Sequence, residues 1–285
     1  MGKLKVAVIG AGGKMGVRTS TNLAKVSDYD LYLVESGDKG LQSIKDRGFT
    51  PYKAEDIVPK VEVVVLAVPD TLINVVSKDI VKLMSPGAGL LILDPAAAVA
   101  KELALRDDCT FGVVHPCHPS YFIDQDSYEA RHDYFGGQGG KQDIVMAKIQ
   151  GDDNRFAQLR AVAEKMFAPV VNSYVMDARS IAFLEPTLVE LLGATCLYAM
   201  AETVKEAERR GIQKEAAVSF LSGHIYNLTA NFLGFLGNTQ VSDACKVAIS
   251  LGNKLVLRDD WKKIWDDDIL DKVIATMLHP NNPKI

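Results

Sequence analysis

The sequence has little of several features that would assign a function directly. Its four cysteines show no Cys-x-x-Cys spacing and are too sparse for a disulfide scaffold, which argues against a zinc ribbon or a redox dithiol. No uninterrupted apolar run reaches about 18 residues, and a strand-like segment opens the chain where a secretory signal would need a long apolar core. We therefore expect a cytoplasmic protein without a membrane span, carrying these reduced thiols: Cys109, Cys117, Cys196 and Cys245.

The sequence also lacks a large excess of charge of one sign. The formal net charge is −4, and no run of like charges forms a tail or stripe, so nucleic acid is not an expected partner. The 285 residues are 48% hydrophobic and 24% charged, which is typical of a globular protein with room for two domains. We expect the partner to be a small molecule.

The first half of the chain alternates apolar runs with amphipathic segments. Such alternation is typical of parallel βαβ units, because parallel neighbours need a crossover. The pattern predicts a doubly wound α/β domain over residues 1–176, closed by a helix over 153–167 between two further strand-like runs. The predicted strands cover residues 4–9, 30–34, 61–68, 89–93, 110–114, 144–149 and 170–175.

A glycine-rich turn follows the first predicted strand and precedes a predicted helix. Glycines permit a tight turn and a close approach of backbone N–H groups to a pyrophosphate, while the helix N-terminus attracts negative charge. Glu35 ends the second strand, where a carboxylate accepts hydrogen bonds from a ribose diol and repels a 2′-phosphate. This Rossmann-type pattern predicts NAD rather than NADP as cofactor, bound by Gly10, Gly12, Gly13, Lys14, Met15, Gly16 and Glu35.

Two further segments are expected at the carboxyl edge of the sheet, where such folds bind ligands. Val68, Pro69 and Asp70 follow a strand, and Asp70 is expected to cap the next helix beside the cofactor. The run VVHPCHPSYF places His115 just beyond what we predict to be the last parallel strand, 110–114. His118 and Ser120 are candidate substrate contacts, with packing and turn capping as the alternatives. Residues 123–142 form either a mobile flap or a linker.

Residues 177–285 are predicted to form an all-helical domain. A long helix is expected from Glu185–Pro186 to about Arg210, with Glu185 as its cap, followed by helices at 214–232, from 242 and from 266. Residues 190–201 are apolar almost all the way round the helix, which indicates burial by other helices or by a second subunit. We therefore expect a homodimer.

The start of the long helix carries two carboxylates. Glu190 interrupts an apolar stripe, and a buried carboxylate must be paired, protonated or bound to a metal. We predict that His115 and Glu190 converge as a catalytic pair that binds a divalent metal or relays protons, with a core hydrogen bond as the alternative for Glu190. Glu185, His224 and Asn227 are expected to contact substrate, although the last two could equally belong to an interhelical hydrogen-bond ladder or to a solvated edge.

The GxxGxMG turn, the LAVP strand end and the long helix with Ala201-Glu202 and Gly211-Ile212 resemble the 6-phosphogluconate and β-hydroxyacid dehydrogenase superfamily over essentially the whole chain. The resemblance implies oxidation of a hydroxyl near a carboxylate. In that superfamily a catalytic lysine, followed by an asparagine, stands near the start of the long helix. This chain has Glu185-Pro186 and Val189-Glu190 at the corresponding positions.

Ketol-acid reductoisomerases, in the wider dinucleotide-binding superfamily, hold magnesium with carboxylates on the equivalent helix. The sequence looks most like the D-apionate oxidoisomerases, and this resemblance implies NAD-dependent oxidation of a small polyhydroxy acid followed by migration of a carbon group. Two alternatives stay open: a simple NAD-dependent hydroxyacid or sugar-acid dehydrogenase, and an NAD-binding redox sensor without catalysis.

Overall fold

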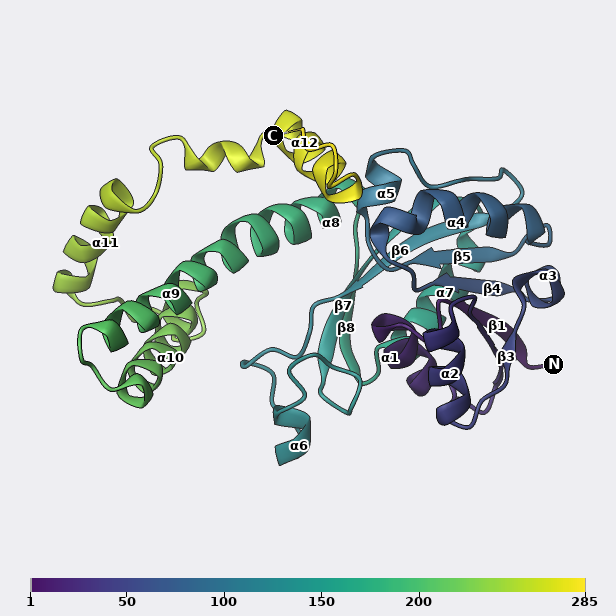
Figure 1. Ribbon diagram of the computed structural model, residues 1–285, viewed down its shortest axis with the longest axis horizontal. Coiled ribbons are helices and arrows are strands. Elements are labelled where there is room, and N and C mark those ends of the chain that lie inside the picture. Colours follow the sequence, from purple (N-terminus) through teal and green to yellow (C-terminus); the bar gives the residue numbers. More distant parts are fainter. Residues whose placement is uncertain (1, 285) are drawn as a thin grey trace. The chain divides into compact units, whose positions relative to one another are not determined.

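A computed structural model describes residues 2–284 (Figure 1). The described chain divides into two compact units. The first ends at Phe183 and takes up the chain again from Asp271, and the second is Leu184–Leu270. The expected fold class, a Rossmann-type domain followed by a helical part, is confirmed. The boundary between the two units falls after the short helix 178–182 that follows the last strand. The sequence placed it before that helix, at residue 176.

The first unit is built on one eight-stranded sheet with the order β3-β2-β1-β4-β5-β6-β7-β8 (Figure 1). Its central strands are buried on both faces, which is why their sequences are continuous apolar runs rather than alternating ones. The strands are β1 (Leu4–Ile9), β2 (Tyr29–Val34), β3 (Pro51–Tyr52), β4 (Val63–Leu66), β5 (Gly89–Ile92), β6 (Thr110–Pro116), β7 (Gln142–Gln150) and β8 (Val170–Val175).

The sheet is mixed, which corrects the expectation of a wholly parallel one. Strands β1 to β6 run parallel, β7 runs antiparallel to β6, and β8 runs parallel to β7. The physical reason is the connection between β6 and β7: it contains only one short helix, so it supplies no crossover to the far face. Strand β6 is therefore the last parallel strand but not the last strand, and it includes His115 instead of ending before it.

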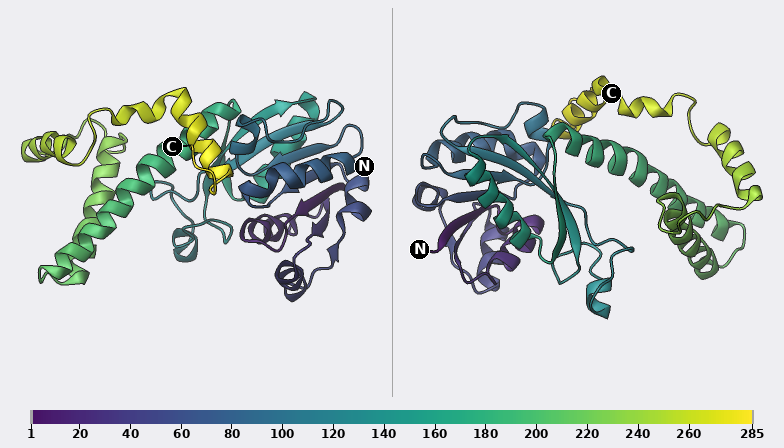
Figure 2. Two further views of the ribbon diagram at one scale, coloured as in Figure 1. Left: turned by 45° about the horizontal axis from the view of Figure 1, so that its top comes forward. Right: turned by 180° about the vertical axis from the view of Figure 1, so that it is seen from behind.

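Helices cover both faces of this sheet (Figures 1 and 2). Helices α1 and α7 contact each other on one face, while α4, α5 and α8 form a connected layer on the other. The α1–α7 contact includes two hydrogen bonds from the Asn22 amide to the carbonyls of Met166 and Ala168. The helical elements are α1 (Lys14–Leu23), α2 (Asp38–Asp46), α3 (Ala54–Ile57), η1 (Val58–Lys60), α4 (Asp70–Leu83), α5 (Ala96–Val99), α6 (Tyr128–Arg131), α7 (Asp153–Met166), α8 (Ala178–Ala182) and α12 (Asp267–Leu278).

The long helix begins earlier than the sequence predicted. Asp177 caps α8 by accepting a hydrogen bond from the Ser180 backbone N–H, so Glu185 is not the cap. Helical structure then continues without a break to Arg209. Pro186 lies inside this helix, where it lacks an N–H and would clash with an ordinary α-helical turn. The chain accommodates it by widening into a π-helix.

The second unit contains all of η2 (Phe183–Ala194) except its first residue, together with α9 (Thr195–Arg209), α10 (Lys214–Phe232), α11 (Asp243–Leu255) and η3 (Trp261–Trp265). Helices α9 and α10 lie side by side (Figures 1 and 2). Within this chain, α9 and α11 bury no residue, and Ala230 is the one buried residue of α10. By length and composition alone the helical run Ala178–Arg209 is apolar enough to cross a membrane, a test that helices packed in protein cores also meet.

Candidate active site

The glycine-rich turn joins β1 to α1. Gly10 has φ +78°, and the Gly13 N–H closes the turn by donating to the Gly10 carbonyl at 3.1 Å. A Cβ at Gly16 would lie 2.0 Å from that carbonyl oxygen, so the helix can start here only with glycine. The turn thus presents the N–H groups at the start of α1 to the carboxyl edge of the sheet. A pyrophosphate fits this cradle.

The side chains of Lys14 and Met15 have partners within the first unit. The Lys14 Nζ lies 4.0 Å from the centroid of the Phe135 ring, and Met15 packs against the core of the first unit. Their contact with the cofactor stays a prediction, and both residues lie in the first turn of α1.

Glu35 stands at the end of β2 beside this turn. Its Oε2 accepts the Gly12 N–H at 3.1 Å, and its Oε1 accepts the N–H groups of Ser36 and Gly37 at 2.9 and 3.3 Å. These bonds fix the carboxylate at the mouth of a pocket of about 580 Å³, a volume that suits the adenosine half of a dinucleotide. The pocket is lined by Ile9, Gly10, Val34, Glu35, Ser36, Leu41, Pro51, Tyr52, Lys53, Ala54, Glu55, Val68, Val76 and Ile80.

Three parallel strands deliver titratable side chains to the same edge of the sheet. Asp70 opens α4 after β4, with Pro69 rather than Asp70 at the N-cap. Asp94 follows β5, is 7% exposed, and accepts the Ala96 N–H at 2.7 Å. His115 is the penultimate residue of β6. Because β4, β5 and β6 are consecutive neighbours, their carboxyl ends meet at one place.

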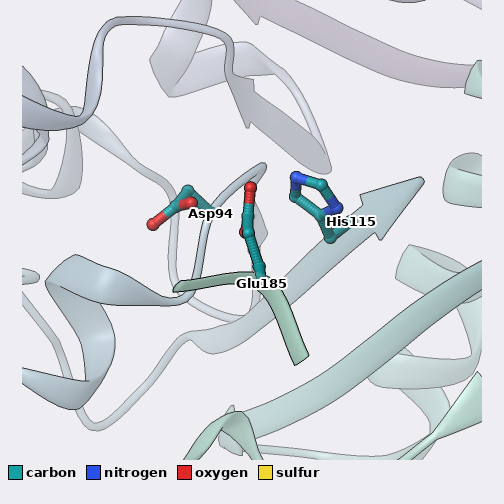
Figure 3. Close-up of side chains that lie close together, drawn as sticks. All are labelled: Asp94, His115 and Glu185. Carbon is teal, nitrogen blue, oxygen red and sulfur yellow. The ribbon is translucent and has the colours of Figure 1, made fainter. Parts of the chain in front are cut away.

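Glu185 joins two of these residues (Figure 3). One ligand atom from each of Asp94, His115 and Glu185 lies within 4.8 Å of the others. Glu185 stands shortly after α8, whose Ile181 and Ala182 are buried. One imidazole nitrogen and two carboxylate oxygens are a donor set that suits a divalent cation.

The electrostatics of this edge agree with that reading. Burial and the neighbouring Asp94 raise the pKa of Asp70 to about 6, and His115 lowers it in part. Two carboxylates near each other in a poorly solvated place disfavour each other's charged form. A divalent cation bound at this edge would relieve the repulsion between Asp70 and Asp94.

His118 lies beside the same edge in a strained backbone conformation, with φ +62°. Its Nδ1 is 2.9 Å from the Phe135 carbonyl oxygen, and its ring centroid is 6.4 Å from that of His115. Since a carbonyl can only accept, Nδ1 carries the proton and Nε2 of the neutral ring remains an acceptor. Burial lowers the pKa of His118, outweighing the Phe135 bond and acting with Arg18, so the neutral form is favoured.

The loop that holds Phe135 is ordered by one buried carboxylate. Asp133 accepts the backbone N–H groups of Gly136, Gln138 and Gly140 at 2.9, 2.7 and 3.1 Å. The Arg18 guanidinium packs against the Phe135 ring, with its Cζ 4.6 Å from the centroid. These contacts lie within residues 123–142, for which the sequence left a flap or a linker open. They order the segment whose Phe135 carbonyl positions His118.

The other predicted contacts have these local surroundings. Glu190 is exposed rather than buried and does not belong to the group formed by Asp94, His115 and Glu185, so Glu185 replaces it as the candidate partner of His115. His224 stacks on Phe220 and its Nδ1 bonds the Phe220 carbonyl at 2.7 Å. Asn227 is exposed, and the Ser120 hydroxyl accepts the Phe122 N–H at 3.2 Å as a turn cap.

Asp94 is the site residue that the sequence reading missed. Its signal was present: Leu93-Asp94-Pro95 ends a predicted strand just as Val68-Pro69-Asp70 does. The same rule that selected Asp70 would have selected Asp94, because both follow parallel strands at the carboxyl edge.

The fold and this edge define the class of the protein as a dinucleotide-binding oxidoreductase with a helical C-terminal part. Residues 123–278 match the family described as phosphogluconate dehydrogenase (decarboxylating) C-term, and residues 1–139 match the NADPH-binding domain of acetohydroxy acid isomeroreductase. The chain is 70% identical to D-apionate oxidoisomerase of Blautia hydrogenotrophica over the full length of both. It is 43% identical to that of Cupriavidus necator, covering 93% of this chain and 95% of the relative. The chain belongs to the D-apionate oxidoisomerase family.

Solved structures agree with this assignment. A semialdehyde dehydrogenase NAD-binding protein from Cupriavidus necator, solved in complex with calcium and NAD, has a TM-score of 0.92 at 41% identity, covering 96% of this chain and 99% of that one. An NADH-preferring ketol-acid reductoisomerase from an uncultured archaeon has a TM-score of 0.67 at 16% identity, covering 98% of this chain and 84% of that one, which supports the fold alone. The resemblance stated from the sequence is confirmed.

Proposed function

We propose that this protein oxidises the C2 hydroxyl of D-apionate with NAD and then moves a hydroxymethyl group to C2, giving 3-oxoisoapionate. The observation that carries the proposal is the group formed by Asp94, His115 and Glu185 at the edge where the dinucleotide cradle opens. The name of the relatives supports the substrate. The calcium and NAD bound by the similar structure support the two cofactors.

The oxidation needs a hydride acceptor and a base. The C2 hydrogen leaves as hydride to the nicotinamide ring of NAD, while the hydroxyl proton passes to the Nε2 of His118. The Phe135 carbonyl holds the other ring nitrogen, so the imidazole keeps one tautomer and one orientation. C2 becomes a ketone next to the tertiary alcohol at C3.

The rearrangement conserves atoms and electrons. The C3 hydroxyl loses its proton, a hydroxymethyl group migrates with its bonding pair from C3 to C2, the C3 oxygen becomes a carbonyl, and the C2 oxygen takes up a proton. When bound by Asp94, His115 and Glu185, a divalent cation supplies Lewis acidity at the two neighbouring oxygens. The buried Asp94, whose Oδ1 is fixed by the Ala96 N–H, sets the orientation of this group.

The exposed apolar surface of the second unit supports a homodimer. Phe220, Tyr198 and Leu197 are 71, 69 and 54% exposed, and α9 and α11 bury nothing within one chain. A helical unit that buries so little cannot offset its own chain entropy. We therefore propose a second copy of the chain as the partner that covers it.

The assignment is tested by comparing two carboxylate variants on the same helix. We expect Glu185→Gln to lower kcat/KM with D-apionate at least about a hundredfold, because losing even outer partners of a metal ligand costs about ten- to a hundredfold. Glu190→Gln is the matched control and should retain activity within about twofold, as is usual for an exposed position.

Product identity tests the reaction itself. Wild-type protein is incubated with D-apionate or linear aldonates and NAD, with and without a chelator, and the carbon skeleton of the product is determined by NMR. A product that keeps the skeleton of D-apionate would make the protein a simple dehydrogenase. Full activity of Glu185→Gln together with loss in Glu190→Gln would move the site to Glu190.

A further inference from the structure

Helix α2 lies directly on the glycine-rich turn through two glycines. A Cβ at Gly12 would lie 2.3 Å from the Cα of Gly40 and 2.4 Å from its carbonyl oxygen. Gly40 stands in the first turn of α2, in ordinary helical conformation, where glycine is less favourable than alanine. Its presence therefore needs a reason other than the helix.

The carboxylate of Glu35 occupies the space that a side chain at Gly40 would need. A Cβ at Gly40 would meet the Cδ and Oε2 of Glu35 at 2.5 Å and its Cγ at 2.6 Å. The same Oε2 accepts the Gly12 N–H. We propose that Gly40 is a positioning residue for cofactor selection: its missing side chain lets Glu35 hold the place at which the adenosine ribose binds.

The helix cannot retreat to make room for a larger residue. Arg47, at the end of α2, donates to the Ala11 carbonyl and to the Ser20 hydroxyl, each at 2.9 Å. Ala11 belongs to the glycine-rich turn and Ser20 to α1. These two hydrogen bonds therefore hold α2 against the turn and α1. The end of the flexible Glu35 side chain is then the group that yields, and the protein still folds.

A displaced carboxylate would lose the two properties that select NAD. It would no longer accept hydrogen bonds from the ribose diol at its present position, and it would no longer oppose a 2′-phosphate there. Gly40→Ala should therefore weaken NAD binding and reduce discrimination against NADP. The inference rests on NAD as the cofactor of the proposed function.

The experiment measures the dissociation constants of NAD and NADP by fluorescence titration of the full chain, together with thermal unfolding. We expect Gly40→Ala to weaken NAD binding about ten- to a hundredfold, the range for a hydrogen bond to a charged group. Thermal unfolding checks that the variant is folded at the temperature of the titration. Gly37→Ala is the matched control, because a Cβ there would lie 4.0 Å from Glu35 Oε1, and NAD binding should change less than about twofold.

A double mutant separates positioning from other effects. In a Glu35→Ala background, Gly40→Ala should change NAD binding little, since the group it displaces is gone. Unchanged NAD binding by Gly40→Ala, or an equal loss with and without Glu35, would overturn the inference while leaving the proposed function intact. Failure of the wild-type protein to bind NAD would overturn both.

Discussion

Asp133 offers the sharpest test of how the chain builds its site. The carboxylate is 6% exposed and accepts one N–H at Oδ1, from Gly136, and two at Oδ2, from Gln138 and Gly140. Each such bond to a charged acceptor contributes about 1.5–3 kcal/mol, and the three share one group and do not add fully. Removing one partner of a buried charged network costs about 3–5 kcal/mol, which is our expectation for Asp133→Ala.

Asparagine cannot replace this residue. An amide presents one oxygen and one NH₂ group, so Asp133→Asn faces either one or two backbone N–H donors with a donor of its own. Nearby Arg18 is a second reason why a charged residue is needed at this position. Burial lowers the pKa of its guanidinium to about 10, and the negative charge of Asp133 raises that pKa in part. Both variants should therefore destabilise the loop, with alanine the worse.

Amide hydrogen exchange is the assay, because the loop can open without unfolding the whole chain. At 3 kcal/mol or more, exchange of the Gly136, Gln138 and Gly140 amides should accelerate about a hundredfold or more in Asp133→Ala. Asp126→Ala is the control: Asp126 pairs with Lys141 at an exposed site, and its loss should cost under about 1 kcal/mol. Unchanged protection of the three amides in Asp133→Ala would refute the reasoning.

Two further outcomes are expected. The pKa of Glu102 is lowered chiefly by its bond to His279 and also by Asn74. The ionised Glu102 carboxylate therefore stabilises the fold fully above its ordinary pKa of 4.5, and this stabilisation is lost as pH falls. Urea titrations should therefore give wild type and Glu102→Gln free energies of unfolding that differ by under about 1 kcal/mol at about pH 6 and converge at about pH 3. A difference that stays constant with pH contradicts this. Sedimentation should give a dimer for wild type and monomer for Phe220→Glu, and a monomeric wild type would exclude the second copy.

Local patterns were sufficient wherever one stretch of chain carries the whole signal. The apolar run of β1, the turn after it and Glu35 at the end of β2 were correctly placed because strand, turn and helix follow one another within one βαβ unit. The same holds for α7 and α10, whose predicted and observed bounds agree within a residue. These elements need no knowledge of distant partners.

Where strands and helices meet distant parts, the local patterns failed. The β7 segment reads as any other buried strand, and its antiparallel direction comes from the loop before it. Pro186 read as a helix start because nothing local indicates that a π-helix will accommodate it. His279, near the end of the chain, bonds Glu102 across the first unit, and no local pattern indicates this contact.

The sequence by itself determined the dinucleotide half of the site, since the glycine turn and the acidic residue at the end of the next strand lie within one βαβ unit. Only the tertiary structure decided which carboxylates meet His115. Asp94 and Glu185 come from segments far apart in the chain, and their meeting depends on strand order and on where the long helix begins. A contact between distant residues is a property of packing, and no spacing within one segment encodes it.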